Sequence, residues 1–432
     1  MFRIMVWLYN LVLPLGFIGF LPGLIFKLIN RPGWKSTFAE RFGFFSAKRL
    51  SRWRNEQGGT WIHAVSVGET MIALSLIKKM LQANPAERII LSTTTTTGQE
   101  LARQKAPDQV QVIFAPIDFY WTVNKFYRVL KVERLVIFET EIWPNMLGIA
   151  AKKGIPAFLV NARMSDHSCR GYYRFRCFFG PLLAEFKLII AQSEADAERF
   201  HKVSPAAQVA VSGNLKFDQY IDPNLPAADF SGYFGPGKFK ILIAASTHPG
   251  EEKLVIETYK QLLAKHPDLR LVVAPRHAER GGEVANLFKQ ADISFAQRSI
   301  MPDSPVPVMA VLADTTGELL KLMKAADVVI MGKSLAGQDE GHNLIEPALL
   351  GKAIVCGAVL RNFRFVLNVL TAADALALVS ADSELLNVLD SLFLDENERK
   401  LLGDKAKAAI SIHSGAIEKT LTIFKTVKKT RK

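Results

Sequence analysis

The stretch Trp-Ile-His-Ala-Val-Ser-Val-Gly-Glu-Thr at residues 61–70 contains one carboxylate whose position suggests chemistry. Residues 61–66 predict a short buried strand, Val67-Gly68 a tight turn, and residues 70–80 the helix that follows. Glu69 is therefore expected at the carboxyl end of a strand, where open parallel sheets bind ligands. The same position also suits a carboxylate that only complements the helix N-terminus.

Two further carboxylates, Glu139 and Glu141, follow another predicted strand. The segment Phe-Glu-Thr-Glu-Ile-Trp-Pro-Asn at 138–145 ends that strand and begins a helix with a proline near its first turn. Two acids at this spacing exceed what capping requires, so we expect one of them to orient a basic group or a substrate hydroxyl.

Basic residues come next, first Arg163 and then a run of Arg170, Arg174 and Arg176 between aromatic side chains. Such runs are usually solvated faces. Beside a membrane anchor, this one could hold anionic lipid phosphates.

In the second half of the chain, Arg276 and His277 end a predicted strand. Arg276 is a candidate for holding a phosphate or a sugar carboxylate with two hydrogen bonds. His277 could serve the same site or be a structural histidine.

The segment Gly-His-Asn-Leu-Ile-Glu-Pro at 341–347 precedes a short predicted helix at 348–350. An acid near free helix amides suits a nucleotide, because N–H groups bind phosphate oxygens and the carboxylate binds ribose hydroxyls. Asn343 and Glu346 are the candidates here, and the backbone from Gly332 through Ser334 to Leu335 could add donors. A helix cap with a surface glutamate explains the spacing equally well.

Several motifs of nucleotide and metal enzymes are absent or false. No Gly-x-Gly-x-x-Gly follows a strand, and Gly332-Lys333-Ser334 lacks the first glycine of a phosphate-binding loop because Asp327 stands there. The sequence has no Asp-x-Asp at a strand end and no His-x-x-x-His. We expect neither a cofactor nor an obligatory metal.

The elements that must position these residues alternate between strand-like and helical runs, which predicts βαβ units and parallel sheets. Strands are expected at 61–66, 88–95, 110–115, 134–139, 157–161, 188–192, 208–213, 239–245, 269–274, 306–312, 328–331, 353–356 and 375–379. The fold class is thus α/β, with two Rossmann-like parallel-sheet domains. GT-B glycosyltransferases have this architecture, although periodicity alone does not identify it.

Domain boundaries follow from composition. At 432 residues and 49% apolar content the chain is long enough for two buried cores. We expect an anchor at 1–30, a first domain at 31–217, a linker rich in proline and glycine at 218–238, a second domain at 239–413 and a basic amphipathic helix at 414–432.

Net charge and cysteine content indicate the kind of partner and the cellular compartment. The net charge of +13 favours a polyanionic partner, which could be nucleic acid, an anionic membrane or a phosphorylated substrate. The three cysteines are scattered and suit a reducing cytoplasm.

The N-terminal segment favours a membrane over the other polyanions. Residues 4–26 carry no charge and would extend about 35 Å as a helix, enough to cross a bilayer. Prolines and glycines interrupt the segment, so it could instead be a hydrophobic hairpin packed on the protein. Basic residues just downstream predict that the bulk of the chain lies in the cytoplasm.

Taken in order, the motifs resemble those of the 3-deoxy-D-manno-octulosonic acid (Kdo) transferases of lipopolysaccharide biosynthesis. The resemblance runs from the N-terminal segment to about residue 365. Its motifs are His63-Ala-x-Ser-x-Gly-Glu69, Glu139-Thr-Glu-x-Trp-Pro-Asn145, Asn161-Ala-Arg163, Gly213-Asn-x-Lys216, Ala274-Pro-Arg-His277 and Gly341-His-Asn-x-x-Glu-Pro347.

The resemblance implies a GT-B enzyme on the cytoplasmic face of the inner membrane that moves Kdo from CMP-Kdo to the lipid A precursor lipid IVA. It implies that Glu69 is the general base of an inverting transfer, with no metal, no cofactor and no nucleic-acid partner. The implied donor-binding residues are Arg276, His277, Lys216, Gly332, Ser334, Asn343 and Glu346, and the implied acceptor-binding or supporting residues are Glu139, Glu141, Arg163, Arg170 and Arg174.

Two departures leave the donor loop's geometry open. Lys333 stands where many relatives have glycine, and Leu344 where they usually have proline. The alternatives are a GT-B transferase with a different nucleotide sugar and a non-enzymatic membrane protein that binds anionic lipids.

Overall fold

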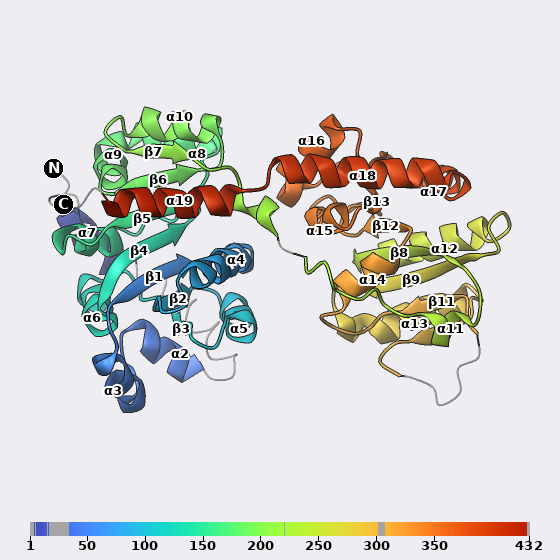
Figure 1. Ribbon diagram of the computed structural model, residues 1–432, viewed down its shortest axis with the longest axis horizontal. Coiled ribbons are helices and arrows are strands. Elements are labelled where there is room, and N and C mark those ends of the chain that lie inside the picture. The colour runs from blue at the N-terminus through green and yellow to red at the C-terminus, as the bar shows by residue number, and fades with distance from the viewer. Residues whose placement is uncertain are drawn as a thin grey trace. The chain divides into compact units, whose positions relative to one another are not determined.

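The computed structural model describes residues 4, 6–14, 16, 34–219, 221–300 and 307–429. The chain forms two compact units, each built around its own sheet (Figure 1). The first unit comprises Met1–Asp218 and Ser414–Lys432, and the second comprises Gln219–His413.

The first unit contains a seven-stranded parallel sheet in the order β3-β2-β1-β4-β5-β6-β7. Its strands are β1 (Gly59–Ala64), β2 (Ile89–Thr93), β3 (Gln111–Phe114), β4 (Val132–Phe138), β5 (Ala157–Ala162), β6 (Leu188–Ala191) and β7 (Val209–Val211). The helical elements are α2 (Trp34–Arg41), α3 (Ala47–Asn55), α4 (Val67–Ala83), α5 (Thr96–Lys105), α6 (Tyr120–Leu130), α7 (Pro144–Lys152), α8 (Asp166–Arg174), α9 (Arg176–Ala184), α10 (Glu194–Val203), η1 (Leu215–Asp218) and α19 (Ala416–Lys429). The chain order reverses between β1 and β4, which makes that point the topological switch of the sheet.

Both faces of this sheet are covered, because alternate strand residues enter different cores. Trp61 of β1 packs in the core beneath α6 and α7, whereas its neighbour Ile62 packs in the core beneath α4. The C-terminal helix α19 adds Ile417 and Phe424 to this second core. Figure 1 shows α19, in red, lying on the first unit.

The carboxylate of Asp218 holds the start of α19. It accepts hydrogen bonds from the backbone N–H groups of Gly415 and Ile417. This contact joins the residue at which the chain leaves the first unit to the residues with which it returns.

The second unit repeats the architecture, with a seven-stranded parallel sheet in the order β10-β11-β9-β8-β12-β13-β14. Its strands are β8 (Lys240–Thr247), β9 (Leu269–Pro275), β10 (Phe295–Gln297), β11 (Ala310–Leu312), β12 (Val328–Met331), β13 (Ala353–Gly357) and β14 (Ala377–Val379). The helical elements are α11 (Ser231–Phe234), α12 (Glu251–Leu262), η2 (Ala278–Arg280), α13 (Gly281–Gln290), α14 (Leu319–Ala325), α15 (Ile345–Leu349), η3 (Arg361–Phe363), α16 (Arg364–Ala372), η4 (Asp382–Glu384), α17 (Leu385–Leu394) and α18 (Glu396–Ile412). Here the topological switch lies between β8 and β12.

Residues 218–238 were expected to form a linker between the two domains. In the structure, the chain from Gln219 onward is part of the second unit, and this stretch contains α11. Phe230, Tyr233 and Phe234 are buried there, so aromatic anchors outweigh the local proline and glycine content. The short strand β10 was also missed, because three half-buried residues give almost no periodic signal.

Little of the expected anchor at 1–30 falls within the described residues. Those that do, namely 4, 6–14 and 16, are helical. Across the part of the chain that the structure describes, no helix has the length and apolar content needed to cross a membrane.

Candidate active site

Glu69 lies in the first turn of α4, directly beyond the carboxyl end of β1. Its Oε2 accepts the backbone N–H of Val65 at 2.8 Å, and its Oε1 accepts the hydroxyl of Ser66 at 2.8 Å. Ser66 in turn caps the helix by accepting the backbone N–H of Glu69 at 3.3 Å. The carboxylate thus completes a cap, but each oxygen accepts only one of these bonds and keeps a lone pair for a substrate.

The surroundings of Glu69 make it a stronger base than an exposed glutamate. The residue is 7% exposed, and burial raises the pKa of its carboxyl above the ordinary value. The hydrogen bonds from Val65 and Ser66 oppose that shift, while the negative charge of Glu139 adds to it.

Glu139 and Glu141 follow β4, on the other side of the topological switch from Glu69. Burial raises the pKa of Glu141, and the nearby charge of Glu69 raises it further. The structure therefore brings together three carboxylates predicted from two separate motifs.

Two cations compensate the charge of Glu139. Its Oε2 lies 3.2 Å from Nε of Arg163, and its Oε1 lies 3.3 Å from Nζ of Lys216. Lys216, expected among the donor-binding residues, lies in the first unit, where it pairs with Glu139.

Asn161 explains how Lys216 is brought to this edge. Its Oδ1 accepts the backbone N–H of Leu215 at 3.0 Å, which holds the turn that carries the lysine. Both Glu139 and Asn161 have a φ of 55°, a left-handed conformation that is rare for residues other than glycine. Strained backbone of this kind clusters at functional sites.

Several buried polar atoms at the same edge lack a hydrogen-bond partner within the described residues. They include Nε2 of His63 and Nδ2 of Asn161. Burial lowers the pKa of His63 to about 4, and its Nδ1 contacts Ser92 Oγ at 3.0 Å. Buried polar groups normally have partners, so a ligand at this edge would satisfy them. His63 was not among the predicted site residues, although a histidine inside an apolar strand is a usable signal.

The remaining basic candidates of the first unit, Arg170 and Arg174, form no hydrogen bond or ion pair with these carboxylates in the described part of the chain. Both are exposed on α8. They remain candidates for a separate acceptor contact.

In the second unit, Arg276 and His277 follow β9 and are both exposed at the carboxyl edge of the sheet. Asn343 donates from Nδ2 to Gln219 Oε1 at 3.0 Å and accepts the backbone N–H of Ile345 at 3.1 Å. Asn343 thereby occupies one of the free amides expected at the start of this helix. Glu346 lies half-buried inside the short helix α15, which begins earlier than the expected 348–350.

Glu251, which sequence analysis missed, changes the expected role of the 332–335 backbone. Its carboxylate accepts four backbone N–H groups, those of His248, Lys333, Ser334 and Leu335, at 2.8–2.9 Å. The amide of Ser334 therefore has no free hydrogen for a phosphate, contrary to our expectation.

Close packing against β8 explains why residue 332 is a glycine, which the sequence alone could not show. A Cβ at this position would lie 2.3 Å from the carbonyl oxygen of Ser246, so only glycine permits the close approach to β8. Lys333 has a φ of 60°, which explains why glycine suits that position, and its Nζ pairs with Glu340 at 2.6 Å. Leu344, the other departure, is fully buried.

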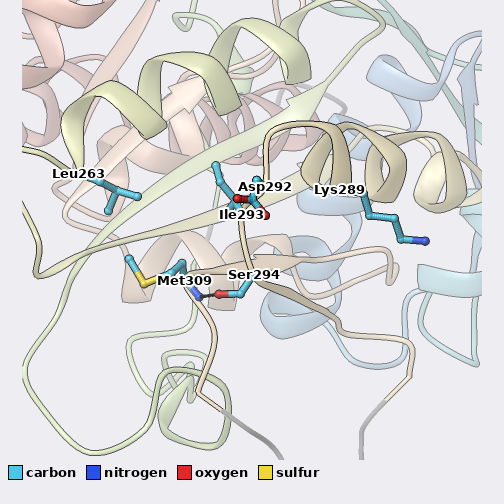
Figure 2. Close-up of a pocket in the computed structure, with 6 residues that line it drawn as sticks. All are labelled: Leu263, Lys289, Asp292, Ile293, Ser294 and Met309. Carbon is cyan, nitrogen blue, oxygen red and sulfur yellow. Dashed lines mark hydrogen bonds between the residues drawn. The ribbon is translucent and has the colours of Figure 1, made fainter.

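A pocket of about 510 Å³ in the second unit lies away from these residues. Figure 2 shows its lining side chains, which lie at the ends of α12 and α13 or just before β10 and β11, at the amino ends of the strands. The dashed line marks the hydrogen bond from the backbone N–H of Met309 to Ser294 Oγ. The candidate residues instead follow the carboxyl ends.

Known proteins resemble this chain in sequence and fold. Residues 36–219 match a family described as "3-Deoxy-D-manno-octulosonic-acid transferase (kdotransferase)". The 3-deoxy-D-manno-octulosonic acid transferase of Bordetella pertussis is 31% identical over 84% of this chain and 85% of its own length. The protein of that name in Haemophilus influenzae is 28% identical over 92% of both chains.

A solved structure supports the fold assignment. The glycosyltransferase from Rickettsia africae aligns with a TM-score of 0.56 and 12% identity, covering 87% of this chain and 100% of its own. At that identity the match concerns the fold alone. The two parallel seven-stranded sheets therefore form a GT-B-like α/β fold.

Proposed function

The chain belongs to the family of 3-deoxy-D-manno-octulosonic acid (Kdo) transferases, and from this premise we propose that it transfers Kdo from CMP-Kdo to lipid IVA. It is a glycosyltransferase. The observation that carries the proposed reaction is the meeting of Glu69 with Glu139 and Glu141 across the topological switch of the first sheet.

Glu69 serves as the general base. When the acceptor hydroxyl attacks the anomeric carbon of Kdo, its proton passes to a free lone pair of the Glu69 carboxylate. Burial raises the pKa of that carboxyl, and a stronger base takes the proton more readily near neutral pH. The attack on the face opposite the departing CMP inverts the configuration.

Glu139 maintains the charge pattern around that base. It pairs with Arg163 and Lys216, and its negative charge raises the pKa of the Glu69 carboxyl. Either cation can also hold a phosphate or carboxylate of a sugar substrate, because each is only partly occupied by Glu139.

The second unit binds the donor nucleotide. Arg276 and His277 lie exposed at the carboxyl edge of its sheet, and Asn343 and Glu346 belong to the loop and helix after β12. The cationic side chain of Arg276 stabilises the negative charge that CMP gains as it leaves. Glu346 is the candidate for the ribose hydroxyls.

The protein works at the cytoplasmic face of the inner membrane, and the helical residues 6–14 support this part of the proposal. Asn10 and Asn145 donate to each other through their side-chain amides at 2.7 and 2.8 Å, which fixes this segment on the first unit. The opposite face presents Ile4, Trp7, Leu8, Leu11 and Val12, which are 49–64% exposed. An apolar stripe of this kind suits the boundary between lipid headgroups and acyl chains.

The reaction is tested with freshly generated CMP-Kdo and lipid IVA in detergent, with EDTA present. The wild type forms product, and Glu69→Gln lowers the rate by two or more orders of magnitude because the amide cannot accept the proton. Glu100→Gln, an exposed glutamate on α5, is the matched control and keeps full activity. A wild type that forms no Kdo product, or a Glu69→Gln variant with full activity, contradicts the proposal.

The membrane contact is tested by sedimentation with vesicles that contain phosphatidylglycerol. Replacing Trp7 and Leu11 with serine lowers the bound fraction severalfold because the apolar contact is lost. The control replaces Leu394 and Ile412, which are 72% and 80% exposed on the second unit, and leaves binding unchanged. Equal losses in both double variants would mean that the N-terminal stripe has no special role.

A further inference from the structure

A pair of histidines occupies the topological switch of the second sheet. His248 follows β8, and His342 lies in the loop after β12, the two strands that flank the switch. Their Nε2 atoms are 3.0 Å apart, and their rings stack with centroids separated by 5.2 Å. Neither histidine was selected by sequence analysis as a site residue.

The contact between the two Nε2 atoms limits how the pair can be protonated. One nitrogen must donate the hydrogen and the other must accept it, so the two imidazoles are complementary tautomers when both are neutral. Both Nε2 atoms cannot carry a hydrogen while this bond exists. The pair can therefore take up one additional proton, on the Nδ1 of the donating ring, without losing the bond.

The groups that face the pair are mainly cationic. They are Arg276 and His277 after β9, Lys333 and Glu340 in the loop after β12, Glu252 on α12 and Arg280 on η2. Glu252 is paired with Arg280 at 2.6 Å, and Glu340 is paired with Lys333 at 2.6 Å. Both acids are thus already neutralised by cations.

This environment keeps the pair neutral while no anion is present. Burial and the neighbouring cations lower the pKa of both histidines, that of His342 to about 4. A phosphate beside Arg276 would reverse the electrostatic effect, because its negative charge stabilises an imidazolium. The same edge of an open sheet is where such ligands bind.

We propose that the His248–His342 pair takes up one proton from solvent when the phosphate of a nucleoside monophosphate binds beside Arg276. The inference rests on the proposed function only in taking CMP as the nucleotide. When the bond between the anomeric carbon and the phosphate oxygen breaks, both electrons stay on that oxygen and CMP gains one negative charge. The proton held by the pair balances this charge, while the proton of the acceptor hydroxyl goes separately to Glu69.

Proton uptake can be measured on the full chain by calorimetry of CMP binding at pH 6.5 in two buffers of different ionisation enthalpy. We expect the wild type to take up at least about half a proton more per CMP than His248→Asn or His342→Asn. Comparing variants cancels the titration of CMP itself. His201→Asn, an exposed histidine on α10, is the matched control and takes up as many protons as the wild type.

The pH dependence of CMP affinity gives a second readout. As the pH falls from 7.5 to 6, the CMP affinity of the wild type should rise relative to that of His248→Asn and His342→Asn by roughly threefold to tenfold per pH unit. The reason is that proton uptake on binding sets the slope of affinity against pH. Cytidine, which has no phosphate, should show no such difference.

The outcomes separate the inference from the proposed function. If the wild type transfers Kdo but takes up no more protons than the variants when it binds CMP, only the inference is overturned. CMP binding with uptake, but without Kdo transfer, contradicts only the proposed function. No CMP binding at all overturns both.

Discussion

Glu69 and Glu251 occupy corresponding places in the two units of this molecule, yet their carboxylates differ in what remains available to a substrate. Each glutamate lies at the start of the helix that follows the strand beside the topological switch. Glu69 accepts one hydrogen bond on each oxygen, whereas Glu251 accepts two on each. The first keeps free lone pairs and the second is saturated.

The charges around the two switch points also differ. Glu69 has the acids Glu139 and Glu141 as neighbours; the charge of Glu139 raises the pKa of Glu69, and the charge of Glu69 raises that of Glu141. Around the second switch, the cations Arg276 and Lys333 lower the pKa of His342 instead. The same topology thus supports a proton acceptor in one unit and an anion site in the other, and the side chains from the neighbouring strand decide which.

The largest expected effect separates activity from stability. Glu69→Gln should lower kcat by about 10²–10⁴-fold with little change in Tm, because it removes a proton acceptor but preserves most of the cap. Steady-state kinetics and thermal unfolding of the same preparation check this. If Tm falls by several degrees while the remaining folded protein is fully active, Glu69 is only a capping residue.

Glu251→Gln should give the opposite result. An amide nitrogen would face backbone N–H donors, so the second unit should lose about 1–3 kcal/mol in its free energy of unfolding. Glu257→Gln, an exposed change on the same helix, serves as the control and should stay near the wild type. Denaturant unfolding measures the difference. A Glu251→Gln protein that is as stable as the wild type but inactive would mean that Glu251 acts in the reaction and not in stability.

The pH profile tests the electrostatic part of the comparison. Glu69 must be deprotonated to act, so activity should fall as the pH drops through its raised pKa. Glu139→Gln removes a negative charge that raises this pKa, so the acid limb should move to lower pH by a fraction of a unit. The measurement is kcat/KM against pH in both proteins. A limb that moves to higher pH is incompatible with the assigned roles.

The smallest effect concerns the cations beside Glu139. The side chain of Arg163 is 61% exposed, so Arg163→Ala should cost less than about 1 kcal/mol in unfolding free energy. Lys216, at 29% exposure, should be the more sensitive of the two, and Lys216→Ala should lower activity further than Arg163→Ala. Unfolding and Kdo-transfer assays of the two variants, run in parallel, measure these losses. A larger loss in Arg163→Ala than in Lys216→Ala would make Arg163 the principal partner of Glu139.

Much of the fold was predictable from the sequence because strands buried on both faces read as continuous apolar runs. The expected strands 157–161 and 328–331 match β5 and β12 within a residue. The segment 218–238 was misassigned, because its local composition gives no information about the core against which Phe230 and Tyr233 pack.

The sequence by itself determined which residues stand at strand ends, since apolar periodicity locates each strand and the polar residue after it. It thereby identified Glu69, Glu139 and Arg276 as candidates. Only the tertiary structure decided which of them meet, because strand order is set by long-range packing. It paired Lys216 with Glu139, saturated Glu251 with four amides and brought His248 to His342. Contacts between residues far apart in the chain depend on packing that no local pattern encodes.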